Sequence, residues 1–237
     1  MGENIRIGIT GLPGAGKTQA LVKVIEMLEG EGTRVGGMVT EPILSKNRRV
    51  GFSVLNWMTK EKGVLAHVNN HSRVAVGKYG VDITALEDVG VKAIDDANSG
   101  ADVIIIDEVG KMEVESEKFV AAVKRALESN KPLILTLHKK SRNPLLQDIR
   151  RRDDIRILEV TPVNRNLLPY KIIQLLKGEH ALRAPIFSSK HILFLYMRLF
   201  RAIPEVVPNG RGREDRGDTG RTGRGRHQGG PRLHCHA

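Results

Sequence analysis

The sequence of 237 residues contains one cysteine, Cys235, 4% aromatic residues and no long apolar run. A single cysteine cannot form a disulfide within the chain, which excludes a disulfide-stapled scaffold and favours a reducing compartment. The most apolar stretch, residues 192–197, is far shorter than the ~18 residues that a membrane span needs. The first residues lead directly into a predicted strand and leave no room for a signal peptide. We therefore expect a cytoplasmic protein without a membrane partner.

The formal net charge of +11 is unevenly distributed. Residues 1–177 hold 27 Lys and Arg against 22 Asp and Glu, whereas residues 178–237 hold 11 against 5, nearly all of the cations being Arg. The second segment is rich in Arg and Gly and has too few apolar side chains to offset the entropy of ordering. We predict one folded domain, 1–177, and a largely disordered basic extension, 178–237.

The role of this extension is open between two interpretations. Arg/Gly-rich tails bind single-stranded nucleic acid through charge, which makes nucleic acid a candidate partner. Such segments usually interleave aromatic residues, and residues 211–237 contain none. The alternative is a tail without a function, for example one that results from a shifted reading frame.

Residues 11–18 fit the pattern G-x-x-x-x-G-K-[ST] of a phosphate-binding loop. A short apolar run, residues 5–10, precedes the loop, and a segment with helical spacing follows it. Glycine allows the backbone N–H groups to approach a triphosphate, and the helix start adds its positive dipole end. Lys17 would reach the β- and γ-phosphates, and the Thr18 hydroxyl would ligate Mg²⁺.

The remainder of the domain alternates between strand and helix patterns. A hairpin of residues 50–57 and 63–68 interrupts this alternation, and Thr84 and Glu87 are spaced as a capping box. The alternation predicts an α/β fold with a parallel sheet covered by helices on both faces. The predicted strands are 5–10, 34–40, 102–107, 132–137 and 155–160, and the predicted helices are 17–29, 82–97, 116–129, 143–151 and 167–176.

The apolar run 103–106 ends in Asp107 and Glu108, which is a Walker B pattern. A buried strand would carry Asp107 to the sheet edge beside the phosphate loop, where it would hold Mg²⁺. Glu108 would polarise a water molecule for attack on the γ-phosphorus. We predict Glu108 and Lys17 as catalytic residues, Thr18 and Asp107 as metal ligands, and Mg²⁺ as cofactor. The predicted nucleotide-binding residues are Gly11, Leu12, Pro13, Gly14, Ala15, Gly16, Lys17 and Thr18 in the first motif and Val103, Ile104, Ile105, Ile106, Asp107, Glu108, Val109 and Gly110 in the second.

Residues 107–113, D-E-V-G-K-M-E, closely resemble the D-E-I-G-K-M-E signature of a family of small nucleoside-triphosphatases found in thermophiles and, as the cancer-related NTPase, in humans. Residues 36–41, 48–52, 78–81 and 160–165 agree as well, so the resemblance covers about residues 4–177. It implies a P-loop NTPase with a RecA-like core. It also implies slow, Mg²⁺-dependent hydrolysis of ATP, GTP and other NTPs to NDP and phosphate.

Several further residues are weaker candidates. Lys111 would approach the γ-phosphate, and Thr136 and His138 would sense it or position water, but each also has a purely structural interpretation. Glu41 would lie near the nucleophile, and Arg165, after Asn164, would stack on the base. The run His234, Cys235 and His236 cannot close a tetrahedral metal site with adjacent residues.

Two rival functions remain at this point. A nucleotide or small-molecule kinase shares the same fold, although the adjacent Asp107 and Glu108 favour attack by water. An RNA-associated ATP-binding switch would make use of the basic extension.

Overall fold

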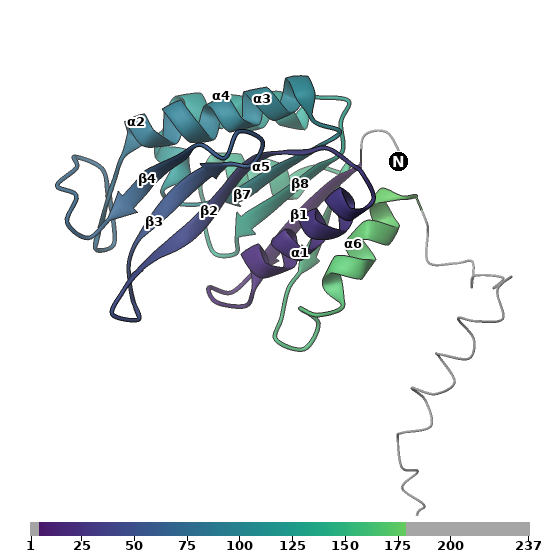
Figure 1. The fold of residues 1–237 in the computed structure, drawn as a ribbon, viewed down its shortest axis with the longest axis horizontal. Coiled ribbons are helices and arrows are strands. Elements are labelled where there is room, and N and C mark those ends of the chain that lie inside the picture. Colours follow the sequence, from purple (N-terminus) through teal and green to yellow (C-terminus); the bar gives the residue numbers. More distant parts are fainter. Residues whose placement is uncertain (1–4, 179–237) are drawn as a thin grey trace, which may run out of the picture. The chain divides into compact units, whose positions relative to one another are not determined.

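The computed structural model describes residues 5–178, which form one sheet with helices on both of its faces (Figure 1). The predictions on the basic extension, on residues 192–197 and on the run His234, Cys235 and His236 lie outside the described residues. Within residues 5–178 no helix is long and apolar enough to cross a membrane.

The elements follow the alternation that the sequence predicts. The strands are β1 (Arg6–Gly11), β2 (Val35–Ser45), β3 (Arg48–Asn56), β4 (Lys62–His67), β5 (Ala75–Val76), β6 (Tyr79–Val81), β7 (Val103–Val109), β8 (Leu133–His138) and β9 (Ile155–Glu159). The helices are α1 (Lys17–Gly30), α2 (Ile83–Ala85), α3 (Lys92–Gly100), α4 (Glu117–Leu127), α5 (Pro144–Arg151) and α6 (Leu168–Leu176), with a π-helical turn η1 (Leu86–Val91) and a 3-10 turn η2 (Glu113–Glu115).

All nine strands belong to one sheet in the order β5-β6-β4-β3-β2-β7-β8-β1-β9. The five strands from β2 to β9 in this order are parallel, which confirms the predicted α/β core. The predicted hairpin is present as β3 and β4, and it extends the same sheet by antiparallel pairing. The sheet is therefore mixed, because β2 continues to Ser45 and turns back at Lys46 and Asn47, both of which have positive φ.

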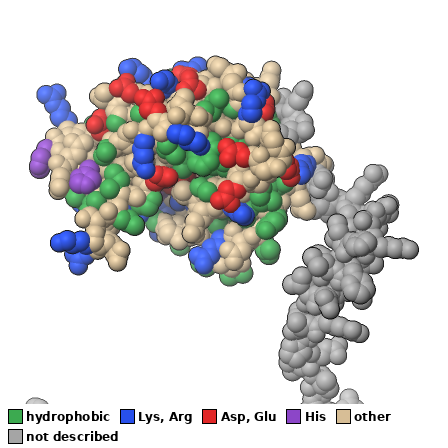
Figure 2. All heavy atoms as spheres, viewed as in Figure 1, with side chains coloured by type: hydrophobic (Ala, Val, Ile, Leu, Met, Phe, Trp, Pro, Cys, Tyr) green, Lys and Arg blue, Asp and Glu red, His purple; other side chains and the backbone are tan. Residues whose placement is uncertain are grey.

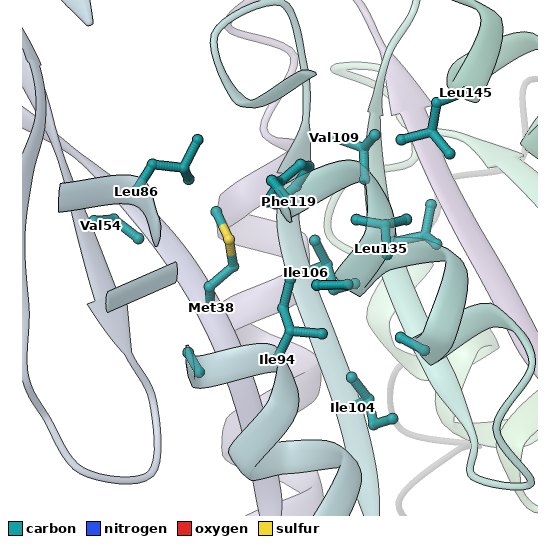
Figure 3. Packing of buried hydrophobic residues seen from close by; sticks show 14 of the residues in the cluster. Met38, Val54, Leu86, Ile94, Ile104, Ile106, Val109, Phe119, Leu135 and Leu145 are labelled. Carbon is teal, nitrogen blue, oxygen red and sulfur yellow. The ribbon is translucent and has the colours of Figure 1, made fainter. Parts of the chain in front are cut away.

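The central strand β7 is buried on both faces of the sheet. Ile104 and Ile106 join one apolar cluster, which contains residues of α3, α4 and α5 (Figure 3). Val103 and Ile105 join the other cluster, with residues of α1 and α6. Because successive side chains of a strand point to opposite faces, a strand covered on both sides must be apolar throughout. This is why β7 appears in the sequence as a continuous apolar run that ends in acid.

A glycine fixes the close approach of β2 to β7. Gly37 has φ +123°, and a Cβ at this position would lie 1.9 Å from the carbonyl oxygen of Ile105. No other residue type fits without displacing backbone. The glycine therefore holds the first part of β2 against the strand that carries Asp107.

The helix of residues 82–97 begins differently from the prediction. The backbone N–H of Ala85 donates to Asp82 Oδ1 at 2.9 Å, so Asp82 is the N-cap. Glu87, expected to close a capping box with Thr84, instead accepts hydrogen bonds from Ser116 and Lys118. Asp82 and Thr84 are both favourable N-cap types, and the tertiary partners of Glu87 decide between them.

Charges of both signs are interspersed over most of the face drawn in Figure 2, where Asp and Glu side chains lie among Lys and Arg side chains. This face of the described domain lacks the single-signed surface that is typical of nucleic-acid-binding domains.

Removal of the extension tests the domain boundary. We expect a chain that ends at Gly178 to unfold cooperatively, with a melting temperature within about 2 °C of the full chain, since this corresponds to less than about 1 kcal/mol. The reason is that the buried residues Leu168, Ile172 and Leu176 of α6 form an apolar cluster with α1 among the described residues. Differential scanning calorimetry measures the melting temperature and the cooperativity of unfolding. A chain that ends at Leu167 is the control and should not melt cooperatively, because it leaves the α1 face uncovered. Loss of cooperative melting in the longer truncation would show that the domain extends past Gly178.

Candidate functional site

The loop between β1 and α1 has the local geometry of an anion site. Gly14 and Gly16 adopt positive φ values of 78° and 101°, and the N–H of Ala15 donates to Leu12 O at 3.0 Å, which closes a tight turn. Gly16 is the N-cap of α1 and provides no side-chain hydrogen bond to the first turn. The N–H groups of that turn are therefore free of a side-chain cap and suit a bound anion. Leu12, Pro13 and Gly14 are exposed, so the loop is accessible from solvent.

The carboxylate of Asp107 lies at the end of β7 and is fully buried. The Thr18 hydroxyl donates to Asp107 Oδ2 at 2.8 Å, and the Thr136 hydroxyl donates to Oδ1 at 2.5 Å. The Thr40 hydroxyl lies 3.4 Å from Oδ2. Burial raises the pKa of the Asp107 carboxyl, and the hydrogen bonds from Thr136 and Thr18 oppose this shift. Side chains from α1, β2 and β8 thus converge on one carboxylate.

Strand β8 separates the two predicted motifs. It pairs with β1 on one side and with β7 on the other, so Thr136 lies between the phosphate loop and Asp107. This strand order is that of a RecA-like core, in which one strand lies between the two motif strands.

Lys17 and Glu108 form an ion pair across the site. The distance between Lys17 Nζ and Glu108 Oε2 is 3.2 Å, and their side chains are 10% and 25% exposed. Each therefore neutralises the other in a partly desolvated position, where an unpaired charge is costly. The two residues predicted as catalytic are in direct contact.

A third carboxyl group, that of Glu113, lies beside this pair. Glu113 is buried at the start of η2, and a Cβ at Gly110 would lie 2.7 Å from Glu113 Oε2 and 2.9 Å from Glu108 Oε1. Burial, followed by the negative charge of Glu108, raises the pKa of Glu113 to about 8. The carboxyl is therefore mainly protonated at neutral pH, which avoids two adjacent buried charges.

The other predicted residues of the second motif either lie between the carboxyl groups or support the strand that carries them. Gly110 follows β7 directly and lies between Glu108 and Glu113. In contrast, the apolar strand residues are fully buried and form the support that carries Asp107 to the sheet edge; they are Val103, Ile104, Ile105, Ile106 and Val109.

Among the weaker candidates, Thr136 lies in the site and Glu41 does not. Glu41 pairs with Lys62 at 2.6 Å, and both side chains are about half exposed. Its neighbour Thr40 approaches Asp107 instead. His138 follows Thr136 by two residues, and its Nδ1 is buried without a hydrogen-bond partner in the described part of the chain. Lys111 is exposed in the turn after β7.

Asn164 and Arg165 have different roles. Asn164 Oδ1 accepts from the N–H of Thr161 at 2.8 Å, and Asn164 Nδ2 donates to Glu159 O at 2.9 Å, so this residue shapes the turn after β9. Arg165 is exposed and lies over Gly16.

Sequence reasoning missed Thr40 and Glu113 as parts of the site. The alternation of β2 would have identified Thr40 if the strand were known to continue past residue 40. Glu113 ends the D-E-V-G-K-M-E stretch, and its position in that motif was the available signal.

The fold and the two motifs define a P-loop nucleotide-binding domain. A family profile described as NTPase matches residues 6–173. The chain therefore belongs to this NTPase family.

Individual relatives agree with this assignment. The nucleoside-triphosphatase THEP1 of Thermoplasma volcanium is 41% identical over 175 residues, which cover 74% of this chain and 98% of the relative. The crystal structure of THEP1 from Aquifex aeolicus has a TM-score of 0.65 at 33% identity and covers 73% of this chain and 99% of its own. The solution structure of a human cancer-related nucleoside triphosphatase has a TM-score of 0.64 at 31% identity and covers 74% of this chain and 98% of its own.

The protonated state of Glu113 predicts a pH-dependent stability. Because the pKa of this carboxyl rises from 4.5 to about 8 on folding, its favourable contribution is present below pH 4.5 and is lost as the pH rises towards 8. Glu113→Gln removes this titration, so its stability relative to the wild type should increase by on the order of 2 kcal/mol between pH 6 and pH 9. Urea unfolding in the presence of EDTA measures the free energy of unfolding of both proteins at each pH. Glu115→Gln, in the exposed neighbour, is the control, and a pH-independent difference for Glu113→Gln would contradict the assignment.

Proposed function

We propose that this protein hydrolyses nucleoside triphosphates to the diphosphate and phosphate in a Mg²⁺-dependent reaction. The names of the relatives support the activity: both the Thermoplasma protein and the human protein are called nucleoside triphosphatases. The observation in this chain that carries the proposal is the contact of Lys17 with Glu108, beside an Asp107 carboxylate held by Thr18.

The environment of Asp107 fits a divalent cation. Its buried carboxylate has hydroxyl partners but no ion-pair partner among residues 5–178, and the nearby charge of Lys17 offsets only part of the cost of its burial. Carboxylate and hydroxyl oxygens are the ligands that Mg²⁺ prefers, and Mg²⁺ commonly combines one or two of them with substrate phosphates. Thr18 and Asp107 would hold the ion, which when bound would neutralise negative charge on the β- and γ-phosphates.

Lys17 would change partners when the substrate binds. In the structure its ammonium group lies 3.2 Å from Glu108 Oε2 and neutralises this carboxylate. A triphosphate in the loop would offer Lys17 a higher density of negative charge, and the carboxylate of Glu108 would then be free to accept a proton. Substrate binding and activation of the base are coupled in this way through a single lysine.

The reaction assigned to Glu108 is general-base catalysis. The oxygen of a water molecule attacks the γ-phosphorus, the bond from that phosphorus to the oxygen bridging to the β-phosphate breaks, and the proton of the water passes to the Glu108 carboxylate. Water as acceptor gives free phosphate, whereas a kinase would give a phosphorylated second substrate.

Glu108→Gln tests this role. The amide retains the size of the side chain but cannot take up a proton. We expect kcat to fall roughly 10²–10⁴-fold, the usual contribution of a positioned general base, with the Kd for Mg-ATP close to the wild-type value. A phosphate-release assay and calorimetric titration measure the two quantities.

Glu41→Gln is the matched control, because Glu41 is a partly exposed glutamate paired with Lys62 outside the site. It should leave both quantities unchanged. Turnover retained in Glu108→Gln would transfer the role of base to another group, with His138 the first to test. Loss of Mg-ATP binding would mean that Glu108 holds the metal.

A further inference from the structure

The positive charge of the domain is concentrated in the strands that extend the sheet beyond β2. Residues 42–81 hold seven Lys and Arg side chains but a single acid, Glu61, whereas the rest of residues 1–177 holds 20 Lys and Arg against 21 Asp and Glu. Glu61 in turn pairs with Lys92, which lies outside this segment. The antiparallel extension of the sheet therefore carries a net charge of +6 on a domain that is otherwise nearly neutral.

Part of this extension projects from the sheet as a two-stranded ribbon. Strand β2 pairs with β7 only as far as Met38, and the pairing of β3 with β4 begins at Gly51. Residues 43–49, which we call the ribbon, therefore pair with each other but with no further strand of the described chain. Residues 44–49 are all exposed, and the ribbon ends at the lower left of Figure 1. Because β2 is parallel to β7, it projects from the same sheet edge as Asp107.

The cations of the ribbon and of the turn between β5 and β6 lack acidic partners. Within residues 5–178, no ion pair involves the cations of these two segments, namely Lys46, Arg48, Arg49 and Lys78. Arg49 Nε lies 3.4 Å from the hydroxyl of Tyr79, and Lys78 Nζ lies 5.3 Å from the centroid of the same ring. Two like charges held on one side chain repel each other, and a bound anion would offset this repulsion. At the lower left of Figure 2, Lys or Arg side chains lie without an Asp or Glu beside them.

The composition of the ribbon favours a ligand with repeated negative charges. The turn and the residues that flank it are polar, from Ser45 to Arg48, and Leu44 is the one large apolar side chain of the ribbon that is mostly exposed, at 62%. A protein partner would need an apolar centre in the interface, and insertion into a membrane would need an apolar face. A nucleic acid needs neither, because its phosphates bind to Lys and Arg side chains directly.

The shape of the ribbon favours a DNA duplex among the nucleic acids. The major groove of B-DNA is about 12 Å wide and about 8.5 Å deep and admits a two-stranded β-ribbon. From Ile43 to the end of its turn the ribbon is about 10 Å long, at about 3.3 Å per residue. The major groove of an RNA duplex is too narrow for this. Single strands stack on exposed aromatic rings, whereas Phe52 and Tyr79 beside the ribbon pack edge-to-face on each other.

We propose that the ribbon binds double-stranded DNA by entering the major groove, with Lys46, Arg48, Arg49 and Lys78 on the phosphates. The site consists of residues of the folded domain and uses neither the basic extension nor the nucleotide site. Contacts to phosphates carry no sequence information, so the binding depends on salt and not on sequence. The proposal goes beyond the proposed function, because DNA binding at the ribbon requires no hydrolysis.

Removal of two cations from the ribbon tests the site in the full chain. Fluorescence anisotropy measures the Kd of a labelled DNA duplex of two helical turns between about 50 and 200 mM salt. In the double variant Lys46→Gln/Arg48→Gln we expect the Kd to rise roughly 10-fold, and the slope of log Kd against log salt to fall by about two, one for each lost phosphate contact. The Kd of an RNA duplex of the same length should change by less than about twofold.

Two further double variants separate the position of the charge from its amount. Lys46→Arg/Arg48→Lys keeps both charges and should bind DNA as the wild type does. Lys124→Gln/Lys171→Gln removes the same charge from exposed positions of α4 and α6 and should also bind as the wild type does. Every variant retains the basic extension, so a difference between them belongs to the ribbon. Melting temperatures and phosphate release should match the wild type in all of them, because none of these residues belongs to the nucleotide site.

Other results would overturn the assignment. Absence of duplex binding by the wild type, or unchanged DNA affinity in Lys46→Gln/Arg48→Gln, would show that the ribbon holds no DNA. An equal loss of affinity for the RNA duplex or for single-stranded DNA would contradict entry into the major groove. Loss of binding to phosphatidylserine vesicles or to polyglutamate, with DNA binding unchanged, would assign the ribbon to a membrane or to an acidic protein. Failure of the proposed function has a different signature, namely wild-type protein that binds DNA through the ribbon but releases no phosphate from any triphosphate.

Discussion

The buried carboxylate of Asp107 is the group on which the arrangement of the site depends. It receives hydroxyl hydrogen bonds from Thr18 at the start of α1 and from Thr136 in β8. Leaving a buried carboxylate without partners costs several kcal/mol, so these elements must meet at the end of β7 with little freedom. The phosphate loop is connected to Thr18 directly, and its position relative to β7 is fixed by the same contact.

Compensation of charge extends outward from this carboxylate to its neighbours. Glu108 is neutralised by Lys17, and the pKa of Glu113 is raised because its burial next to Glu108 disfavours a second negative charge. The three carboxyl groups of the site are therefore stabilised in three different ways. Asp107 accepts hydrogen bonds from hydroxyl groups, Glu108 pairs with a lysine, and Glu113 holds a proton. A polyanionic ligand accompanied by a cation would change the first two, because it would engage Lys17 and place a cation beside Asp107.

The sequence predicts those parts of the site that are local in the chain. The loop of residues 11–18 and the pair Asp107 and Glu108 are recognisable because their chemistry requires fixed residue types at fixed spacing. The prediction that Glu41 lies near the nucleophile shows the limit of reasoning from local sequence. Strand β2 continues past residue 40 into the hairpin with β3, so the parity of the strand directs Thr40 towards Asp107 and Glu41 towards Lys62. Only the pairing of β2 with both neighbours decides which of the two residues faces the site.

Sequence reasoning named Arg165 as a candidate to contact the base, but the cavity beside Gly16 that Arg165 lines could not be predicted, for a related reason. Its walls come from α1, from the turn after β9 and from α6, and these segments meet because β9 pairs with β1 at the edge of the sheet. The same pairing places the end of β9 beside the end of β1, where Val160 N–H donates to Thr10 O at 2.7 Å. Arg165 thus lies next to Gly16, although the two residues are 149 positions apart in the chain. The phosphate loop is a property of a short motif, whereas the surface beside it is a property of the sheet order.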